Sequence, residues 1–388
     1  MTENSTTQNI IVLGGGYAGV LAANHLLQRE GVNVTLVNAR PEFVERIRLH
    51  QLAIGNDDAT AAYDELLSDK VTLVVDRAER VDTATRRVEL ASGAALDYDH
   101  VIYAVGSTSG AAPEFAYPIS ELEDAQRLRA RLQDIPESAP IVVVGGGLTG
   151  IEAASEFAEG GRTVTLAAGP LLGPSLGAQA RRSAAKQLAK LGVTVIEGPT
   201  VEAVHADRVA LSDGRELASA ATVWTVGFGV PDLATRSGLR TDALGRLLTD
   251  ETLTSIDDDR VVGAGDAVAP SGVPLRMSCQ AAMPLAAQAA RTVLAHLDGT
   301  EAKPVDQAFA GQCVSIGRSY GTIQISHADD SPRRAYIGGR IAASIKEMVC
   351  KGTLWQLRRE AAKPGSYFLM KGGKRAQRLA ATLQKDPA

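Results

Sequence analysis

One segment of this 388-residue sequence occurs twice, and the duplication limits the folds that the chain can adopt. Residues 10–19 read IIVLGGGYAG, and residues 141–150 read IVVVGGGLTG. Four further pairs of similar segments follow the two copies in the same order, at offsets of 121 to 130 residues. Chance similarity does not keep the order and spacing of so many segments, so one type of domain is present twice.

Each copy reads as an apolar strand, a glycine turn, a helix, a second strand, a meander and a last strand that ends in glycine. Buried strands that alternate with helices predict parallel sheets covered on both faces. We therefore predict an α/β fold with two doubly wound, three-layer (ββα-type) Rossmann-like dinucleotide-binding domains and an α+β C-terminal cap. The predicted first domain is discontinuous (1–112 and 238–305), the second is inserted into it (113–237), and the cap with a basic tail is 306–388.

Both glycine motifs follow an apolar strand directly and open a helix, which makes the G-x-G-x-x-G pattern informative. The first glycine permits the tight turn, the second lets a pyrophosphate approach the backbone, and the third permits close helix packing. The phosphates then meet the free N–H groups of the helix. The predicted nucleotide-binding residues are Gly14, Gly15, Gly16, Tyr17, Ala18 and Gly19 in the first loop, and Gly145, Gly147, Leu148, Thr149 and Gly150 in the second.

Neither copy has the acidic residue that usually binds the ribose hydroxyls about 20 residues after the glycines. Asn38 ends the second strand of the first copy; its amide can hydrogen-bond a ribose, and Arg40 can reach a phosphate. In the second copy Ala167 and Ala168 neither repel nor attract a 2′-phosphate. The choice between NADH and NADPH therefore stays open.

A later apolar strand, residues 260–264, ends in Gly265 and Asp266. With this strand the chain resembles the two-dinucleotide flavoprotein reductases of the pyridine nucleotide–disulfide oxidoreductase superfamily. The resemblance implies that FAD and either NADH or NADPH are the cofactors, with the Asp266 carboxylate at the FAD ribitol. Asp266 also suits a helix N-cap, and the two roles are compatible. Gly106 and its counterpart Gly227 end the last strand of each copy and are expected beside the cofactors.

The cysteines distinguish branches of this superfamily. Disulfide reductases carry redox cysteines soon after the second strand, and none occurs between Asn38 and Tyr63. Sulfide:quinone reductases need cysteines that flank the flavin, for which Cys313 and Cys350 are the only candidate pair. Residues 43–55 and 145–156 instead resemble type II NADH dehydrogenases and their apoptosis-inducing-factor-like relatives. No metal site is expected.

This second resemblance implies four catalytic residues. Glu152 would lie between nicotinamide and flavin, where a helix N-terminus stabilises its charge. Arg48 and His50, together with Arg46, would place positive charge beside the reduced flavin. Arg48 and Glu152 are expected to contact cofactor as well, and Lys346 would face the electron acceptor.

The acceptor helix departs from the resembled family. Those quinone reductases carry a glutamine and then two adjacent glutamines that line the quinone tunnel. Here Gln280 is kept, but Pro284 and Leu285 replace the pair. Because proline suits the first turn of a helix, we predict a helix that begins near Pro284 and runs to Leu297. Quinone therefore remains one acceptor among several.

The predicted cap contains an antiparallel hairpin (313–317 and 321–325), a third strand (335–337) and an amphipathic helix with Ile341, Ile345 and Met348 on one face. From residue 332 onward the sequence has 13 Lys or Arg against 3 Asp or Glu, although the net charge of the chain is −5. In type II NADH dehydrogenases such C-terminal helices bind the membrane surface; a tail packed on its own domain is the alternative. No motif indicates nucleic-acid binding.

The sequence has three widely spaced cysteines, no signal peptide and no long apolar span, so we expect a cytoplasmic protein, either free or peripheral at the inner membrane surface. The predicted function is an FAD-dependent NAD(P)H oxidoreductase that passes hydride to flavin N5 and electrons to a quinone or another small acceptor. Three alternatives stay open: a reductase for a ferredoxin-like redox protein, a specialised tailoring flavoenzyme, and a slow NAD(P)H-sensing interaction protein. The oligomeric state is not predicted.

Overall fold

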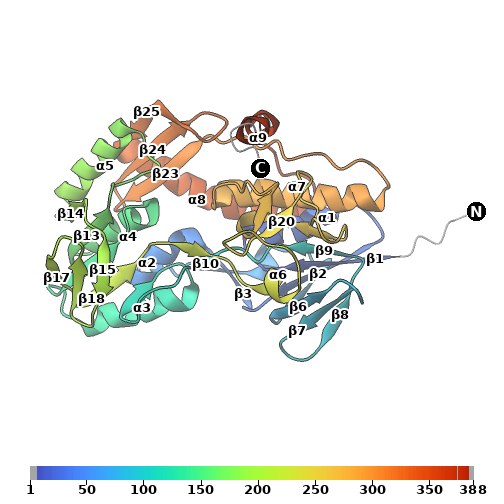
Figure 1. Cartoon of the computed structure of the whole chain (residues 1–388), viewed down its shortest axis with the longest axis horizontal. Coiled ribbons are helices and arrows are strands. Elements are labelled where there is room, and N and C mark those ends of the chain that lie inside the picture. The colour runs from blue at the N-terminus through green and yellow to red at the C-terminus, as the bar shows by residue number, and fades with distance from the viewer. Residues whose placement is uncertain (1–6, 374, 384–388) are drawn as a thin grey trace, which may run out of the picture.

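A computed structural model describes residues 7–373 and 375–383, and Figure 1 shows two lobes, one of them formed by the green middle part of the chain. The first lobe contains a five-stranded sheet in the order β21-β9-β1-β2-β5, parallel throughout. Its strands are β1 (Gln8–Leu13), β2 (Val32–Asn38), β5 (Val71–Val75), β9 (His100–Tyr103) and β21 (Val261–Gly263).

The second lobe repeats this sheet in the order β11-β18-β12-β13-β14, again all parallel. Four strands occupy equivalent places in the two sheets: β1, β2, β5 and β9 in the first, and β12, β13, β14 and β18 in the second. The fifth strand lies beside β9 or β18 at one edge. In the first sheet it is β21, which follows the other four in the sequence, and in the second it is β11, which precedes them. The predicted pair of doubly wound parallel sheets is confirmed. The strands are β11 (Ala116–Pro118), β12 (Pro140–Val144), β13 (Thr163–Gly169), β14 (Thr194–Glu197) and β18 (Ala221–Trp224).

Each sheet lies between helices and an antiparallel meander, which gives three layers (Figure 1). The helix α1 (Tyr17–Leu26) is buried on all sides, because small residues such as Gly19 and Ala22 let the sheet and α7 (Cys279–Leu297) pack against it. The other elements of these layers are α3 (Leu122–Asp134), α4 (Leu148–Glu159), α5 (Ala178–Lys190), β6 (Ala78–Asp82), β7 (Arg87–Leu90), β8 (Ala95–Asp97), β15 (Val201–Val204), β16 (Arg208–Leu211) and β17 (Glu216–Ala218).

The helix α7 corrects one prediction. It begins at Cys279, where the Ser278 hydroxyl accepts a hydrogen bond from Ala281 N–H, so Pro284 lies inside the helix and not at its start. Proline has no N–H to donate to the carbonyl four residues earlier. That carbonyl, of Gln280, instead accepts a hydrogen bond of 2.6 Å from Gln307 Nε2, which compensates for the missing helical bond.

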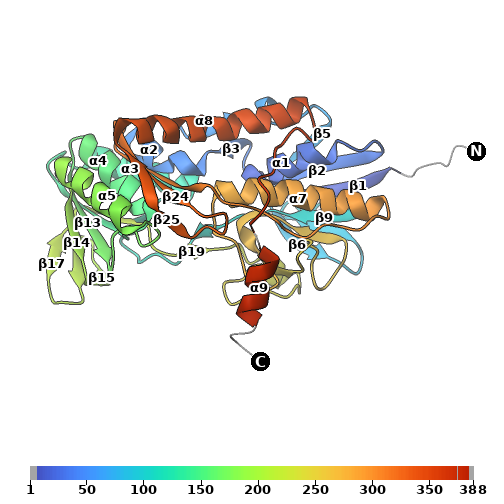
Figure 2. The same ribbon diagram turned by 90° about the horizontal axis from the view of Figure 1, so that it is seen from above.

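The cap consists of the antiparallel strands β23 (Gly311–Ile316), β24 (Tyr320–Ser326) and β25 (Pro332–Gly338), followed by α8 (Gly339–Ala362), which confirms the predicted hairpin, third strand and helix. Figure 2 shows α8 running across both lobes. The predicted apolar face of α8 points outward, since Ile341 is 68% and Met348 64% exposed. Among the residues described, no helix is long and apolar enough to cross a membrane.

The remaining elements are short. Residues 374 and 384–388, which belong to the predicted basic tail, lie outside the described residues. The short elements are β3 (Glu42–Val44), β4 (Thr60–Ala62), β10 (Thr108–Ser109), β19 (Phe228–Gly229), β20 (Leu247–Thr249), β22 (Val268–Pro270), α2 (Leu49–Ile54), α6 (Leu233–Arg236), α9 (Arg375–Leu383), and the 3₁₀ turns η1 (Arg46–Arg48), η2 (Tyr63–Glu65) and η3 (Gly265–Ala267).

Candidate active site between the two glycine loops

The first glycine loop forms an open cradle between β1 and α1. Gly14 has a φ of +98°, and a Cβ on Gly19 would stand 1.7 Å from the Gly14 carbonyl oxygen, so both positions require glycine. A Cβ on Gly16 would meet nothing within 4 Å, and no side chain caps the N-terminus of α1. Open space in front of uncapped helix N–H groups fits a pyrophosphate, and therefore a dinucleotide such as FAD.

The second glycine loop repeats this geometry. Gly145 has a φ of +118°, a Cβ on Gly150 would stand 1.9 Å from the Gly145 carbonyl oxygen, and a Cβ on Gly147 would meet nothing within 4 Å. The predicted residues Leu148 and Thr149 form the first turn of α4, whose N-terminus also has no side-chain cap. A second nucleotide phosphate therefore fits here by the same physical argument.

Asn38 and Arg40 are already engaged at the end of β2. Asn38 Oδ1 accepts a hydrogen bond of 2.9 Å from Gly15 N–H, and its Nδ2 donates to the Arg40 carbonyl. The Arg40 guanidinium pairs with Glu123 and Glu121, at 2.7 and 3.0 Å. Both residues line the first cleft, but these contacts indicate that Asn38 shapes the loop and that two carboxylates balance the Arg40 charge.

Two adjoining clefts, of about 290 and 230 Å³, extend from the first glycine loop to Thr149 of the second and share Gly16, Arg46, Gly106 and Ser107 in their walls. The predicted residues that line them are Gly14, Gly15, Gly16, Tyr17, Ala18, Asn38, Arg40, His50, Gly106, Thr149, Glu152, Gly265, Asp266 and Lys346. The predicted residues outside both clefts are Gly19, Arg48, Gly145, Gly147, Leu148, Gly150 and Gly227.

Arg46, and not Arg48, points into the cleft. Arg46 Nη1 donates to the carbonyl and hydroxyl of Ser107, at 2.6 and 3.0 Å. Arg48 lies on the other side of this helical segment, where it pairs with Glu45 and with Glu347 of α8. Because the segment is helical, residues four apart share a face. His50 is four residues after Arg46 and therefore lies on the cleft together with it. This spacing could be read from the sequence.

Asp266 is held in the cleft by two hydrogen bonds. The Ser107 hydroxyl donates to its Oδ2 at 2.7 Å, and Ser278 N–H donates to its Oδ1 at 3.2 Å. With Arg46, these contacts form a polar chain across the cleft. Sequence reasoning missed Ser107, although it directly follows Gly106.

Glu152 and Lys346 form the most buried ion pair of the cleft. Lys346 Nζ lies 3.1 Å from Glu152 Oε1, which also accepts hydrogen bonds from Ser315 N–H and the Ser315 hydroxyl. Burial disfavours both charges, but Lys346 and His50 lower the pKa of Glu152, and Glu152 raises the pKa of Lys346. The pair is therefore charged at neutral pH. No local sequence signal pointed to Ser315, because the contact joins β23 to α4.

His50 is the neutral member of this group. Burial lowers the pKa of His50 to about 4, against a partly compensating attraction to Glu152. Only 4% of the residue is exposed, and within the described part of the chain its Nε2 atom has no hydrogen-bond partner. A buried polar atom without a partner at a cleft wall fits a site that a ligand completes.

The three cysteines are free thiols. Cys279 lines the cleft at the start of α7, while Cys313 and Cys350 lie on β23 and α8. Burial raises the pKa of each thiol, that of Cys350 to about 12. A thiol with a raised pKa stays protonated at neutral pH and is a poor nucleophile.

Two dinucleotide cradles of the same geometry, with a cleft between them whose walls come from both glycine-loop units, define an oxidoreductase of the two-nucleotide class. The sequence matches the family model "Pyridine nucleotide-disulphide oxidoreductase" over residues 8–292, and the chain belongs to this family. It is accordingly an NAD(P)H-dependent oxidoreductase with FAD and a nicotinamide nucleotide as cofactors, which confirms the predicted cofactors and enzyme class.

Three curated relatives are similar over most of their length. The chain is 31% identical to an NADH dehydrogenase-like protein of Mycobacterium tuberculosis (74% of this chain, 80% of the relative). It is 26% identical to the type II NADH:quinone oxidoreductase of the same species (83% and 80%). It is also 32% identical to terpredoxin reductase of a Pseudomonas species (76% and 76%).

Two solved structures share the fold. The sulfide:quinone oxidoreductase of Aquifex aeolicus superposes with a TM-score of 0.79 at 21% identity, covering 92% of this chain and 93% of that one. A complex of NDH2 from Plasmodium falciparum with NADH gives 0.74 at 16% identity, covering 93% and 99%.

Proposed function

We propose that this protein oxidises NADH or NADPH and reduces a quinone. The reaction consumes one NAD(P)H, one proton and one quinone, and it yields NAD(P)⁺ and quinol. The observation that carries the proposal is the buried ion pair of Glu152 and Lys346, in a cleft whose walls come from both glycine-loop units. The type II NADH:quinone oxidoreductase among the relatives supports quinone as the acceptor.

In this proposal residues 1–112 and 238–305 hold FAD, 113–237 hold the nicotinamide nucleotide, and 306–388 form the acceptor side. The predicted loop residues bind the two pyrophosphates, and Asp266 binds the FAD ribitol. The elongated pair of clefts and the open cradle at Gly16 support this assignment. When bound, FAD accepts hydride and releases electrons, and the protein supplies placement and charge.

Lys346 and His50 have different roles in proton transfer and hydrogen bonding at the acceptor side. Lys346 holds a proton at Nζ, ready to donate to a quinone oxygen, while Glu152 orients that ammonium group. His50 is neutral at pH 7, and its Nε2 atom, which has no hydrogen-bond partner among the described residues, is free to pair with a bound acceptor. Positioned proton donors and acceptors of this kind speed reactions by about 10²- to 10⁴-fold.

We assign the positive charge beside FAD to Arg46, which lines both clefts. Arg48 has a positioning role in this account. Its guanidinium joins Glu45 to Glu347, the residue after Lys346, and so holds α8 in the register that brings Lys346 to Glu152.

The outer face of α8 supports membrane docking. Ile341, Met348 and Trp355 are spaced by seven residues, and each is more than half exposed. Basic side chains flank this stripe, including Lys351 and Arg358. Apolar insertion combined with basic residues binds an anionic bilayer, the phase in which quinones reside.

A redox protein as acceptor is the second candidate. The terpredoxin reductase among the relatives and the loss of the paired glutamines at Pro284 and Leu285 favour it. A shallow hollow on α8 carries Arg318, Arg340 and Lys351, charges that suit an acidic partner.

Reoxidation of the reduced protein tests the proposal. The FAD-loaded chain is reduced anaerobically with NADH or NADPH and then mixed with a water-soluble short-chain quinone or with an acidic ferredoxin. We expect reoxidation by the quinone to be at least about ten times faster than by ferredoxin. The opposite order would establish the second candidate, and slow reaction with both would overturn the proposal.

A further inference from the structure

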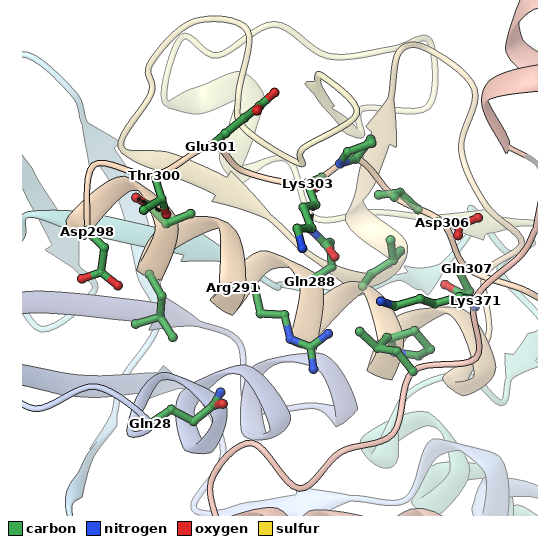
Figure 3. Close-up of a pocket in the computed structure, with 17 residues that line it drawn as sticks. Gln28, Gln288, Arg291, Asp298, Thr300, Glu301, Lys303, Asp306, Gln307 and Lys371 are labelled. Atoms are coloured by element: carbon green, nitrogen blue, oxygen red, sulfur yellow. Dashed lines mark hydrogen bonds between the residues drawn. The ribbon is translucent and has the colours of Figure 1, made fainter.

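A cavity of about 680 Å³ lies on α7, away from the candidate active site (Figure 3). Its walls come from α7 between Pro284 and Ala295, from residues 298–307, from Gln28 after α1, and from Leu369 and Lys371 of the tail. It shares no lining residue with either cleft, to which α7 contributes Cys279 and Ala282. The volume is typical of small-molecule sites.

A buried relay holds Arg291 at the wall of this cavity. Arg291 Nε donates to His25 Nε2 at 3.2 Å, and His25 Nδ1 lies 2.6 Å from Glu360 Oε1. The side chains of His25 and Glu360 are fully buried. A carboxylate at Nδ1 keeps the imidazole proton there, so Nε2 is the acceptor for arginine. The relay therefore fixes one edge of the guanidinium and, among the described residues, leaves both Nη groups without a hydrogen-bond partner.

Three cations point into the cavity from three segments of the chain: Arg291 from α7, Lys303 from the following loop and Lys371 from the tail (Figure 3). Within residues 7–373 and 375–383, none of the three forms an ion pair.

The acidic residues at the rim are directed elsewhere. Asp298 pairs with Arg29, Asp306 accepts from Gly372 N–H, and Glu301 points away from the cavity in Figure 3. Burial lowers the pKa of Arg291, and Glu360, which is linked to Arg291 through His25, compensates only in part.

We propose that this cavity binds an anionic amphiphile, an acyl or isoprenoid chain that carries a phosphate or a carboxylate. Arg291 donates hydrogen bonds from its two free Nη groups to two oxygens of the anion. The exposed side chains of Lys303 and Lys371 attract the anion electrostatically at the entrance of the cavity. The apolar chain lies on the remaining walls, which include Pro284, Leu285, Leu294, Pro304, Val305 and Leu369.

Calorimetric titration of the FAD-loaded full-length chain with monomeric dodecyl phosphate tests this site. We expect saturable binding to one site per chain. Arg291→Gln should weaken it by at least about tenfold, because a bidentate charged contact is lost. The pair Lys303→Ala and Lys371→Ala, whose side chains make no described polar contact, should weaken it by about threefold or more without affecting the fold. Lys186→Ala, which like Arg291→Gln removes one positive charge but from the exposed face of α5, should have no effect.

Two simpler probes test the two parts of the ligand separately. Inorganic phosphate lacks the chain and dodecanol lacks the charge, so each should bind at least about ten times more weakly than dodecyl phosphate. If inorganic phosphate binds as tightly as dodecyl phosphate, the cavity does not bind the apolar chain, and that part of the proposal is overturned. Non-saturable binding, or unchanged binding by both the arginine and the lysine variants, would overturn the site.

Vesicles that contain phosphatidate distinguish the sources of the ligand. Co-sedimentation that the two lysine substitutions abolish would support a membrane lipid. Binding of dodecyl phosphate without vesicle binding would support a free amphiphile.

Discussion

Lys346 Nζ lies 3.1 Å from Glu152 Oε1, although the first residue belongs to α8 of the cap and the second to α4 of the inserted lobe. Ser315 of β23 adds two further hydrogen bonds to the same carboxylate oxygen. The cap is therefore joined to the second glycine-loop unit at the cleft itself. A change at this contact is expected to affect both acceptor chemistry and stability.

Replacing Lys346 tests its chemical role. We expect Lys346→Met to lower the rate of quinone reduction by about 10²-fold, because the acceptor loses a positioned proton donor. Reduction of the enzyme by NADH, followed in single-turnover experiments, should change much less. Lys186→Met removes an exposed lysine on α5, away from the cleft, and should leave both rates unchanged. Equal effects of the two substitutions would refute the assignment.

The stability of the same pair can be measured by a double-mutant cycle. Glu152→Leu leaves the Lys346 cation buried without its carboxylate, and it should reduce the free energy of unfolding by about 3–5 kcal/mol. The double variant Glu152→Leu with Lys346→Met removes both charges and should recover most of that loss. Urea unfolding measures all four proteins. Additive losses would mean that the two side chains do not interact.

The two open glycines provide matched substitutions. Gly16 and Gly147 have φ values of −81° and −69° and room for a Cβ, so Gly16→Ala and Gly147→Ala should fold normally. The added methyl groups fill the space expected for each pyrophosphate. Gly16→Ala should lose FAD during gel filtration, whereas Gly147→Ala should keep FAD but show about tenfold higher KM for NADH. An exchange of these effects would reverse the assignment of the two loops.

The buried imidazole of His50 makes stability depend on pH. Burial lowers the pKa of His50 to about 4, whereas in the unfolded chain a histidine titrates near 6.5. Between these values the unfolded chain binds a proton that the folded chain excludes, so stability falls as the pH falls through this window. His50→Gln should reduce the change in the free energy of unfolding across this pH window by up to about 3 kcal/mol. The exposed His327→Gln is the control, and parallel curves for wild type and His50→Gln would contradict the assignment.

Membrane docking depends on the outer face of α8. Met348→Glu combined with Trp355→Glu places charge on two exposed apolar positions, and it should weaken binding to anionic vesicles by at least about tenfold. Leu244→Glu changes an exposed leucine outside α8 and serves as the control in co-sedimentation. If the α8 variant sediments with vesicles as wild type does, another surface binds the membrane.

Local patterns were sufficient to predict every strand of both sheets except β11. The motif strands β1 and β12 are continuous apolar runs that end in a glycine with positive φ, and this chemistry is contained within a few residues. The hairpin of β23 and β24 was predicted for the same reason. Asp266 and Gly106 line the cleft, and each lies three residues after the end of such a strand.

Contacts between distant segments could not be predicted in this way. Arg48 was chosen over Arg46 because the local helix, which sets the two on different sides, was not recognised. Pro284 suggested a helix start, but Gln307 supplies the compensating hydrogen bond from a separate segment. Likewise, the cations of the α7 cavity come from three segments that only the tertiary fold brings together.

The central claim is that two nucleotides meet in one cleft without a thiol relay. Anaerobic titration of the FAD-loaded protein with NADH, followed by flavin absorbance, tests it most directly. We predict complete bleaching by one equivalent of NADH, because only the flavin accepts electrons. A requirement for two equivalents would reveal a redox-active disulfide, and a flavin that neither NADH nor NADPH bleaches would show that the two nucleotides do not meet; either result would contradict the account.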